Sequence, residues 1–258
     1  MLTFPGFDQL NTILCLGAHA DDIEIGCGGT ILKFLAERPG LKVVWVVFSA
    51  SGPRRAEAKA SAQTFLAGTA RSKIVVKRFR DGFFPYQGEA IKEFFEELKT
   101  MVEPDLVFSH YRDDRHQDHR VLSDFTWNTF RNNLILEYEI PKFDGDLSQP
   151  NVFVPLETKI CEKKVTAISR CFKTQKNKHW FTDDTFFGLM RLRGIECGGN
   201  TKYAEAFYGR KLVLGGSKGS PRIPRQAEAA RLQVNGSHQP LDLPEPVQRS
   251  QRLKTLGP

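Results

Sequence analysis

The sequence predicts an α/β fold: a Rossmann-like parallel sheet covered by helices, followed by an α+β C-terminal portion. Two patterns predict it. Short apolar runs have the length of buried strands, and in the segments between them apolar residues recur every three or four positions. The chain has 258 residues, 40% of them hydrophobic and 26% charged, which is enough to enclose a full core and excludes a wholly disordered chain.

The first half alternates regularly between the two patterns. Apolar runs predict four strands, Thr12–Ala18, Lys42–Phe48, Lys73–Val76 and Asp105–Ser109. Helical spacing predicts helices over Gly26–Glu37, Arg54–Leu66 and Ala90–Met101. In the common doubly wound strand order the first and fourth strands are neighbours, and ligands bind outside their carboxyl ends.

The second half predicts the α+β portion and the end of the domain. We expect strands near Leu134–Ile140, Val152–Leu156 and Ala204–Leu214, with helices over Glu157–Phe172 and Thr182–Arg191. Residues 1–214 should form one domain. Residues 215–258 hold six of the fourteen prolines and no aromatic residue, so we expect a disordered basic tail there.

Charge and targeting signals limit the classes of partner. The tail carries four of the seven net positive charges, which leaves the domain only mildly basic, and we expect no specific nucleic-acid partner. No apolar run approaches the roughly 18 to 20 residues of a membrane span, and the first residues do not resemble a secretory signal. We therefore expect a cytoplasmic protein with free cysteines, because its five cysteines are odd in number and lack a CxxC pair.

A first polar cluster follows the first predicted strand. It contains His19, Asp21 and Asp22, ahead of a run of glycines at 26, 28 and 29. Such residues next to a buried strand are costly unless they are paired or bind a cation. Two other interpretations stay open: Asp22 caps the next helix, or the glycines cradle a phosphate, although they do not match G-x-G-x-x-G and the carboxylates would repel an anion.

A second cluster follows the fourth predicted strand, over residues 110–120. His116 and His119 are three positions apart and would share one side of a helix that begins there. The alternative is a solvated, charge-rich loop. If the two strands are neighbours, His19, Asp22 and His119 together offer two imidazoles and one carboxylate, the composition of a catalytic zinc site with an open position.

The two clusters resemble the motifs of the PIG-L and LmbE-like zinc-dependent N-deacetylases. The A-H-P-D-D motif of that family stands here at residues 18–22, and its H-x-D-H motif at residues 116–119. The resemblance implies that His19, Asp22 and His119 bind the metal and that Asp21 is the general base. It further implies that His116 and Asp118 act as a catalytic pair. An Arg three residues before a Glu, here Arg54 before Glu57, resembles a substrate contact.

Two local features qualify this resemblance. Ala20 replaces the proline of the first motif, which removes no ligand but removes a residue that would stiffen the loop. Cys27 follows the proposed ligands closely and is either a competing soft ligand or a small packing residue.

Together these expectations describe a metal-dependent hydrolase that removes an acetyl group from an N-acetylated amino sugar or sugar conjugate. Zinc is the expected metal, and Fe²⁺ or Mn²⁺ also suits two histidines and one aspartate. Asp21 would take the proton of the attacking water, and a partly protonated His116 would stabilise the oxyanion. Two alternatives remain: a Rossmann-type nucleotide-binding protein and a catalytically silent carbohydrate-binding module.

Overall fold

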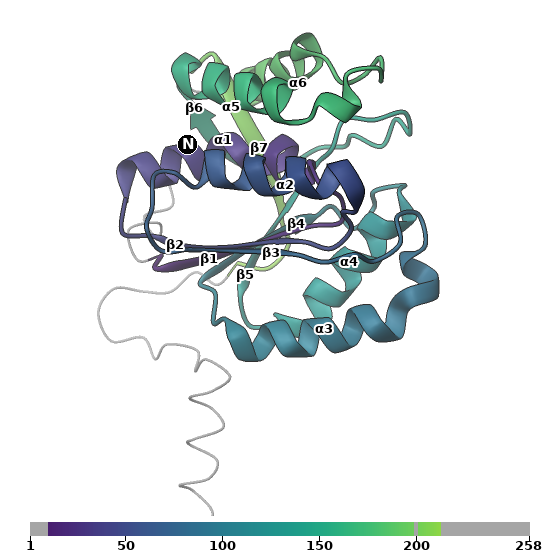
Figure 1. The fold of residues 1–258 in the computed structure, drawn as a ribbon. Coiled ribbons are helices and arrows are strands. Elements are labelled where there is room, and N and C mark those ends of the chain that lie inside the picture. Colours follow the sequence, from purple (N-terminus) through teal and green to yellow (C-terminus); the bar gives the residue numbers. More distant parts are fainter. Residues whose placement is uncertain (1–9, 199–200, 213–258) are drawn as a thin grey trace, which may run out of the picture. The chain divides into compact units, whose positions relative to one another are not determined.

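A computed structural model describes residues 10–198 and 201–212, so the predicted tail lies outside the described residues. Within them, one seven-stranded sheet is flanked by six α-helices, which confirms the predicted fold class (Figure 1). The strands are β1 (Thr12–Gly17), β2 (Lys42–Val47), β3 (Ser72–Val76), β4 (Leu106–His110), β5 (Leu134–Tyr138), β6 (Val152–Leu156) and β7 (Tyr203–Gly209). The helices are α1 (Asp22–Glu37), α2 (Gly52–Phe65), α3 (Gly88–Met101), α4 (Gln117–Thr129), α5 (Thr158–Cys171) and α6 (Asp183–Glu196), with short 3₁₀ helices η2 (Phe84–Gln87) and η3 (Lys173–Gln175).

The strand order places the two polar clusters side by side. The order is β3-β2-β1-β4-β5-β7-β6, and β1 pairs in parallel with β4, with Ile13 opposite Leu106 and Cys15 opposite Phe108. The predicted neighbourhood of the first and fourth strands is therefore confirmed. The strands of the second half do not form a separate layer: β5 is parallel to β4, and antiparallel β7 and β6 extend the same sheet.

Alternate residues of each central strand feed two separate hydrophobic clusters. On β2, Trp45 belongs to a cluster with buried residues of α1, α2, α5 and α6. Its neighbour Val46 faces the opposite cluster, which holds the apolar side of α3, including Phe95, and Leu122 of α4. Figure 1 shows these two helical layers on opposite faces of the sheet. Because both faces are covered, the strands read as continuous apolar runs.

Helix α1 begins at Asp22, four residues before the predicted start, and its glycines serve close packing. A Cβ on Gly26 would lie 2.2 Å from the Tyr138 ring, and one on Gly28 would lie 2.6 Å from Phe65. Because these side chains fill the space over the glycines, we conclude that the glycine run does not cradle a phosphate. Helix capping by Asp22 is also wrong, since Asp21 holds the N-cap position and makes no capping hydrogen bond with its side chain.

A buried ion pair fastens the second half of the domain to α1. Lys164 of α5 donates to the carbonyl oxygen of Ile25 at 2.6 Å and to Glu205 of β7 at 2.7 Å. The Glu205 carboxylate accepts the N–H groups of Gly29 at 2.8 Å and Thr30 at 2.6 Å. We call Lys164 and Glu205 the α1 bracket. It holds the helix whose first residue is a proposed ligand.

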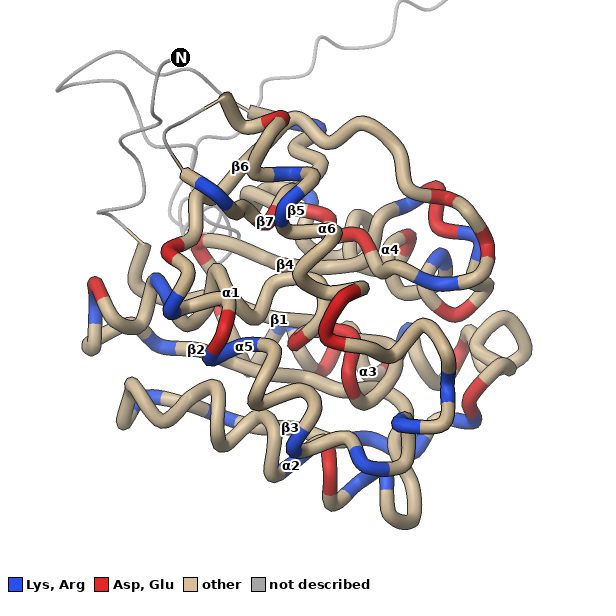
Figure 2. The backbone as a smooth tube through the Cα atoms, turned by 90° about the horizontal axis from the view of Figure 1, so that it is seen from above, with Lys and Arg blue, Asp and Glu red and all other residues tan. Residues whose placement is uncertain are grey.

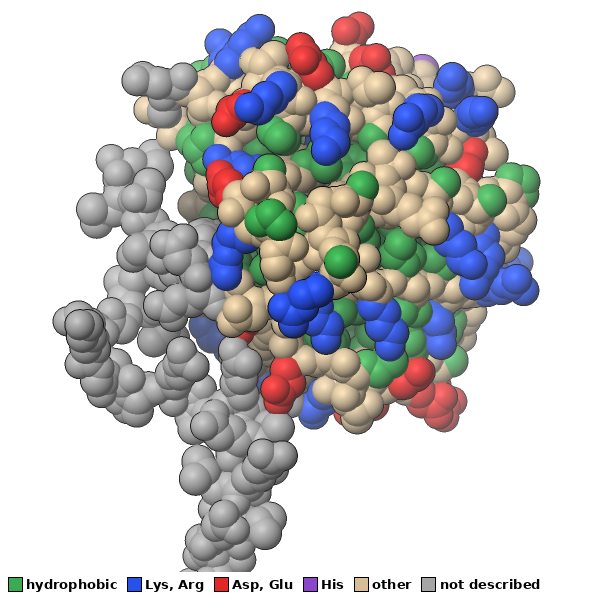
Figure 3. Space-filling model, turned by 60° about the vertical axis from the view of Figure 1, so that its left-hand side comes forward, with side chains coloured by type: hydrophobic (Ala, Val, Ile, Leu, Met, Phe, Trp, Pro, Cys, Tyr) green, Lys and Arg blue, Asp and Glu red, His purple; other side chains and the backbone are tan. Residues whose placement is uncertain are grey.

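Charges of both signs are interspersed along the described backbone (Figure 2). On the face drawn in Figure 3, Lys and Arg side chains lie in separate groups among hydrophobic and acidic ones. The helices that the structure describes include none with the length and apolarity needed to cross a membrane.

Candidate metal centre and catalytic cleft

The two polar clusters meet at the carboxyl edge of β1 and β4. His19 and Asp21 lie in the turn after β1, and Asp22 is the first residue of α1. His116 is the N-cap of α4, where its Nδ1 accepts the N–H of Asp118 at 3.3 Å. The sequence placed His116 and His119 on one side only if a helix begins at this point. Helix α4 does begin there, and it turns His119 toward the first cluster.

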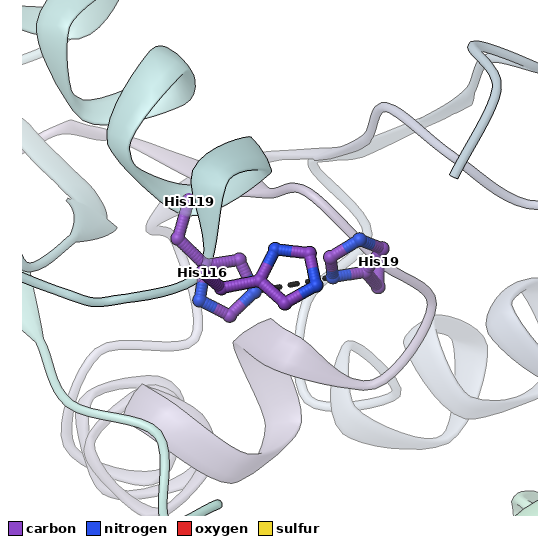
Figure 4. A group of neighbouring side chains, drawn as sticks. All are labelled: His19, His116 and His119. Atoms are coloured by element: carbon purple, nitrogen blue, oxygen red, sulfur yellow. Dashed lines mark hydrogen bonds between the residues drawn. The ribbon is translucent and has the colours of Figure 1, made fainter. Parts of the chain in front are cut away.

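The three proposed ligand atoms form a compact triangle. His19 Nδ1 lies 3.1 Å from His119 Nε2 and 3.4 Å from Asp22 Oδ2, and the last two atoms are 3.6 Å apart. Four ligands at 2.0–2.2 Å around a tetrahedral zinc would be separated by about 3.3–3.6 Å. Figure 4 shows the rings of His19 and His119 converging, with His116 beside them. The residues therefore fit a divalent metal ion.

Carboxylates orient both imidazoles. Asp114 Oδ2 contacts His119 Nδ1 at 2.9 Å, which leaves Nε2 free for a metal. On the other ring, His19 Nε2 lies 3.2 Å from both Asp118 and Asp81. A carboxylate behind each ligand histidine fixes its tautomer and increases its basicity, and such partners are usual in metal sites.

The electrostatics of the triangle favour a positive charge within it. Burial alone would lower the pKa of His19, but the carboxylates of Asp22 and Asp118 raise that pKa well above its usual value. Burial would raise the pKa of Asp22, yet the three histidines His119, His110 and His19 lower it well below its usual value. Burial, assisted by His110, lowers the pKa of His119 to about 3, so its Nε2 keeps a lone pair for a metal.

Asp118 has a different partner from the one expected. The expectation paired its carboxylate with His116. In the structure the carboxylate accepts the N–H groups of Gly82 at 2.7 Å and Phe84 at 3.1 Å and contacts His19. Burial would raise the pKa of Asp118, but these hydrogen bonds lower it. Asp118 therefore fastens the segment before α3 to a proposed metal ligand.

Asp21 and Arg54 form an ion pair at the cleft. Arg54 Nη2 donates to Asp21 Oδ1 at 2.7 Å, while its Nη1 lies 3.5 Å from Glu57. Burial raises the pKa of Asp21; Arg54 opposes this shift and the charge of Asp22 adds to it. Arg54, predicted as a substrate contact, lines the cleft and also restrains the proposed base.

Several residues of this site have no role implied by the two motifs. His110, fully buried at the end of β4, places Nε2 3.1 Å from Asp22 Oδ2, and its ring stacks on that of His119 at 3.8 Å. Asp114 and Lys142 are ion-paired at 3.0 Å. His110 and Asp114 belong to the same charge-rich segment as His116, so that segment was their only sequence signal. Cys27 is buried in the core, where its thiol donates to the Ile23 carbonyl oxygen, which supports the packing interpretation.

A cleft of about 350 Å³ opens over the triangle. Such a volume lies within the range of small-molecule sites. Its lining includes residues from both halves of the domain: His19, Asp21, Asp22, Arg54, Asp81, His116, His119, Ile140, Lys142, Phe143, Asp144, Gln175, Lys178 and Trp180.

Solved structures with the same fold include two deacetylases and a hydratase. N,N'-diacetylchitobiose deacetylase from Pyrococcus horikoshii is 23% identical with a TM-score of 0.61, covering 80% of this chain and 86% of its own. Teicoplanin deacetylase Orf2 is 15% identical with a TM-score of 0.60, covering 77% and 97%. The 4-carboxy-2-hydroxymuconate hydratase GalB from Pseudomonas putida is 17% identical with a TM-score of 0.64, covering 81% and 100%. At these identities the likeness establishes the fold.

The sheet and its edge cluster define an α/β protein with a candidate metal centre. Residues 14–130, which contain both motifs, match the PIG-L family, described as GlcNAc-PI de-N-acetylase. The match confirms the resemblance that the two motifs predicted for this segment.

Proposed function

We propose that the protein is a metal-dependent N-deacetylase that hydrolyses the acetamide of an N-acetylated amino sugar or sugar conjugate. The observation that carries the proposal is the triangle of His19, Asp22 and His119 with Asp21 beside it at the cleft. The family match and the deacetylases among the structural neighbours support it. The reaction adds the water oxygen to the carbonyl carbon, breaks the C–N bond and yields acetate and the free amine.

Zinc is the proposed metal, held by His19, Asp22 and His119. When bound, a divalent cation supplies a Lewis acid that polarises the amide and makes water a better nucleophile near neutral pH. Fe²⁺ or Mn²⁺ would also suit this donor set.

Asp21 is the proposed general base and later the general acid. Its carboxylate accepts a proton from the attacking water and afterwards donates that proton to the leaving amine nitrogen. The raised pKa makes it a stronger base, and the ion pair with Arg54 keeps it ionised and fixes its orientation.

His116 is the proposed oxyanion donor, and the geometry changes how it would act. Burial, followed by the charge of His19, lowers the pKa of His116, so this residue would act as a neutral ring and not as the partly protonated one that we expected from the sequence. Its Nδ1 accepts the N–H of Asp118, which places the proton of the neutral ring on Nε2. A neutral imidazole can therefore donate a hydrogen bond to the developing oxyanion.

Release of acetate from N-acetylated sugars by the zinc-loaded protein tests this function. We expect turnover that is lost on chelation and restored by zinc, and lost in His19→Ala and His119→Ala together with the metal. The hydratase GalB shows that this fold also supports addition of water to other substrates. A metal-loaded, folded protein that releases no acetate from a broad panel of such sugars would refute the deacetylase proposal.

A further inference from the structure

The cleft has an outer part that the proposed hydrolysis does not use. We call its residues the outer wall: Phe143, Asp144, Gln175, Lys178 and Trp180. They lie on two connections, one between β5 and β6 and the other between α5 and α6. The rings of Phe143 and His179, 4.9 Å apart, bring these connections together.

Aromatic surface at the outer wall is open to a ligand. The Phe143 side chain is 70% exposed, and Trp180 is half-buried. Lys178 Nζ lies 5.8 Å from the centroid of the Trp180 ring. Aromatic rings at the mouth of a cleft provide a flat apolar surface for a ligand that has an apolar face of its own.

The charges of the outer wall balance. Two basic residues that line the cleft are already paired, Arg54 with Asp21 and Lys142 with Asp114. Neither Lys178 nor Asp144 forms an ion pair with another residue that the structure describes. The outer wall therefore offers one ammonium donor and one carboxylate acceptor, and a phosphate bound at Lys178 would be repelled by Asp144.

We propose that the outer wall binds a second, neutral sugar ring, so that the substrate is an oligosaccharide with a terminal N-acetylated unit. The inference rests on the proposed deacetylase function for the inner part of the cleft. A sugar ring presents a C–H face that packs on Trp180 or Phe143. Its hydroxyls both donate and accept hydrogen bonds, and so satisfy Asp144 and Lys178 together.

Three substrates separate the outer wall from the catalytic part: N-acetylglucosamine, its 1-phosphate and N,N'-diacetylchitobiose. We expect kcat/KM to be highest for the disaccharide. Trp180→Ala and Phe143→Ala should each lower that value about tenfold, the size of one aromatic contact, and lower the monosaccharide value by less. Tyr86→Ala is the matched control, because that exposed aromatic residue does not line the cleft.

The remaining outcomes overturn the inference. A preference for the 1-phosphate would assign the outer wall to an anion. Equal kcat/KM for mono- and disaccharide, or an equal loss on both in Trp180→Ala, would show that no second ring is bound there.

A binding measurement keeps the inference separate from the proposed function. Calorimetry with the disaccharide and the monosaccharide requires no turnover. If no acetate is released but the disaccharide binds more tightly in a Phe143-dependent manner, the outer wall is supported and the deacetylase function fails. If the two sugars bind equally, the outer-wall inference fails.

Discussion

Asp21 and Asp22 are neighbours in the sequence, but their carboxylates face different partners. Asp21 meets the guanidinium of Arg54, whereas Asp22 Oδ2 lies 3.1 Å from His110 and accepts the N–H of His19 at 2.6 Å. The Asp21 carboxylate is therefore the one proposed for proton transfer, whereas the Asp22 carboxylate is held by the nitrogens of His110 and His19.

This difference predicts that two conservative variants differ in metal content. Asp21→Asn should keep the metal and the fold, while kcat for deacetylation falls by roughly 10² to 10⁴-fold, the usual size of a general acid–base contribution. Asp22→Asn should lose metal, because an amide is a poor ligand. Metal content and kcat measured side by side check both. Near-normal turnover of a metal-loaded Asp21→Asn protein would rule out its role as base.

Asp114 should determine metal affinity although it is not a proposed ligand. Replacing it by Asn weakens the contact that orients His119, and we expect the zinc affinity to fall by roughly 10 to 100-fold. Asp113→Asn is the matched control, since that neighbouring carboxylate is 66% exposed and lies 3.8 Å from Arg210. Competition with a zinc chelator measures both affinities, and equal losses would contradict the assignment.

Glu24 predicts a pH dependence of the metal-free protein. Burial raises its pKa to about 8, with Ser61 acting in the opposite direction. Because the pKa of Glu24 in the folded protein exceeds its ordinary value of 4.5, the protonated side chain stabilises the fold. This stabilisation is complete below about pH 4.5 and is lost as the pH rises through about 8.

Glu24→Gln should remove this dependence, because glutamine keeps the shape without titrating. We expect the variant to differ little from the native protein near pH 5 and to melt at a higher temperature at pH 9. Thermal unfolding at the two pH values provides the measurement, and an unchanged difference between them would contradict the assignment.

At the scale of elements, the α1 bracket connects three elements that are distant in the sequence. Its two charges are buried, so removal of one leaves the other without compensation. Glu205→Gln should lower the free energy of unfolding by about 3 to 5 kcal/mol. The exposed pair Glu157 and Lys159 is the control, and breaking it should have no measurable effect.

A double variant tests whether the two bracket residues act together. Adding Lys164→Met to Glu205→Gln should cost less than the sum of the two single variants, because it removes the uncompensated charge. Urea unfolding measures all three. Additive effects would show that the two side chains contribute independently.

The elements show which features a sequence can predict. The strands β1, β2 and β4 were found because both of their faces are apolar, and their adjacency then brought His19 and His119 together. The start of α1 was missed because its glycines resemble a loop. These glycines are required because Tyr138 and Phe65 pack against them, and both of those residues are remote in the sequence.

The walls of the site were less predictable than its ligands. The proposed ligands lie in two short segments, one directly after β1 and the other shortly after β4. Short sequence motifs are therefore enough to reveal them. Asp81 and Trp180 reach the cleft from connections whose paths depend on packing of the whole domain, and no periodicity marks them.

At the scale of the whole molecule, we propose that residues 1–214 are the functional unit. The last aromatic residue is Tyr208, and the 44 residues after Leu214 contain little apolar surface that could join the core. A protein that ends near Gly215 should keep its melting temperature, metal content and most of its kcat/KM. A large drop in melting temperature after truncation would contradict this division.

The positions of the proposed ligands and of the outer wall have an evolutionary consequence. His19, Asp22 and His119 lie within residues 14–130, the segment that matches the family, whereas the outer wall begins at Phe143. After gene duplication, substitutions in two surface connections would give a copy a new substrate without disturbing the residues proposed to hydrolyse the amide. Homologues of this chain should therefore diverge in the sugars they accept sooner than in the reaction they perform.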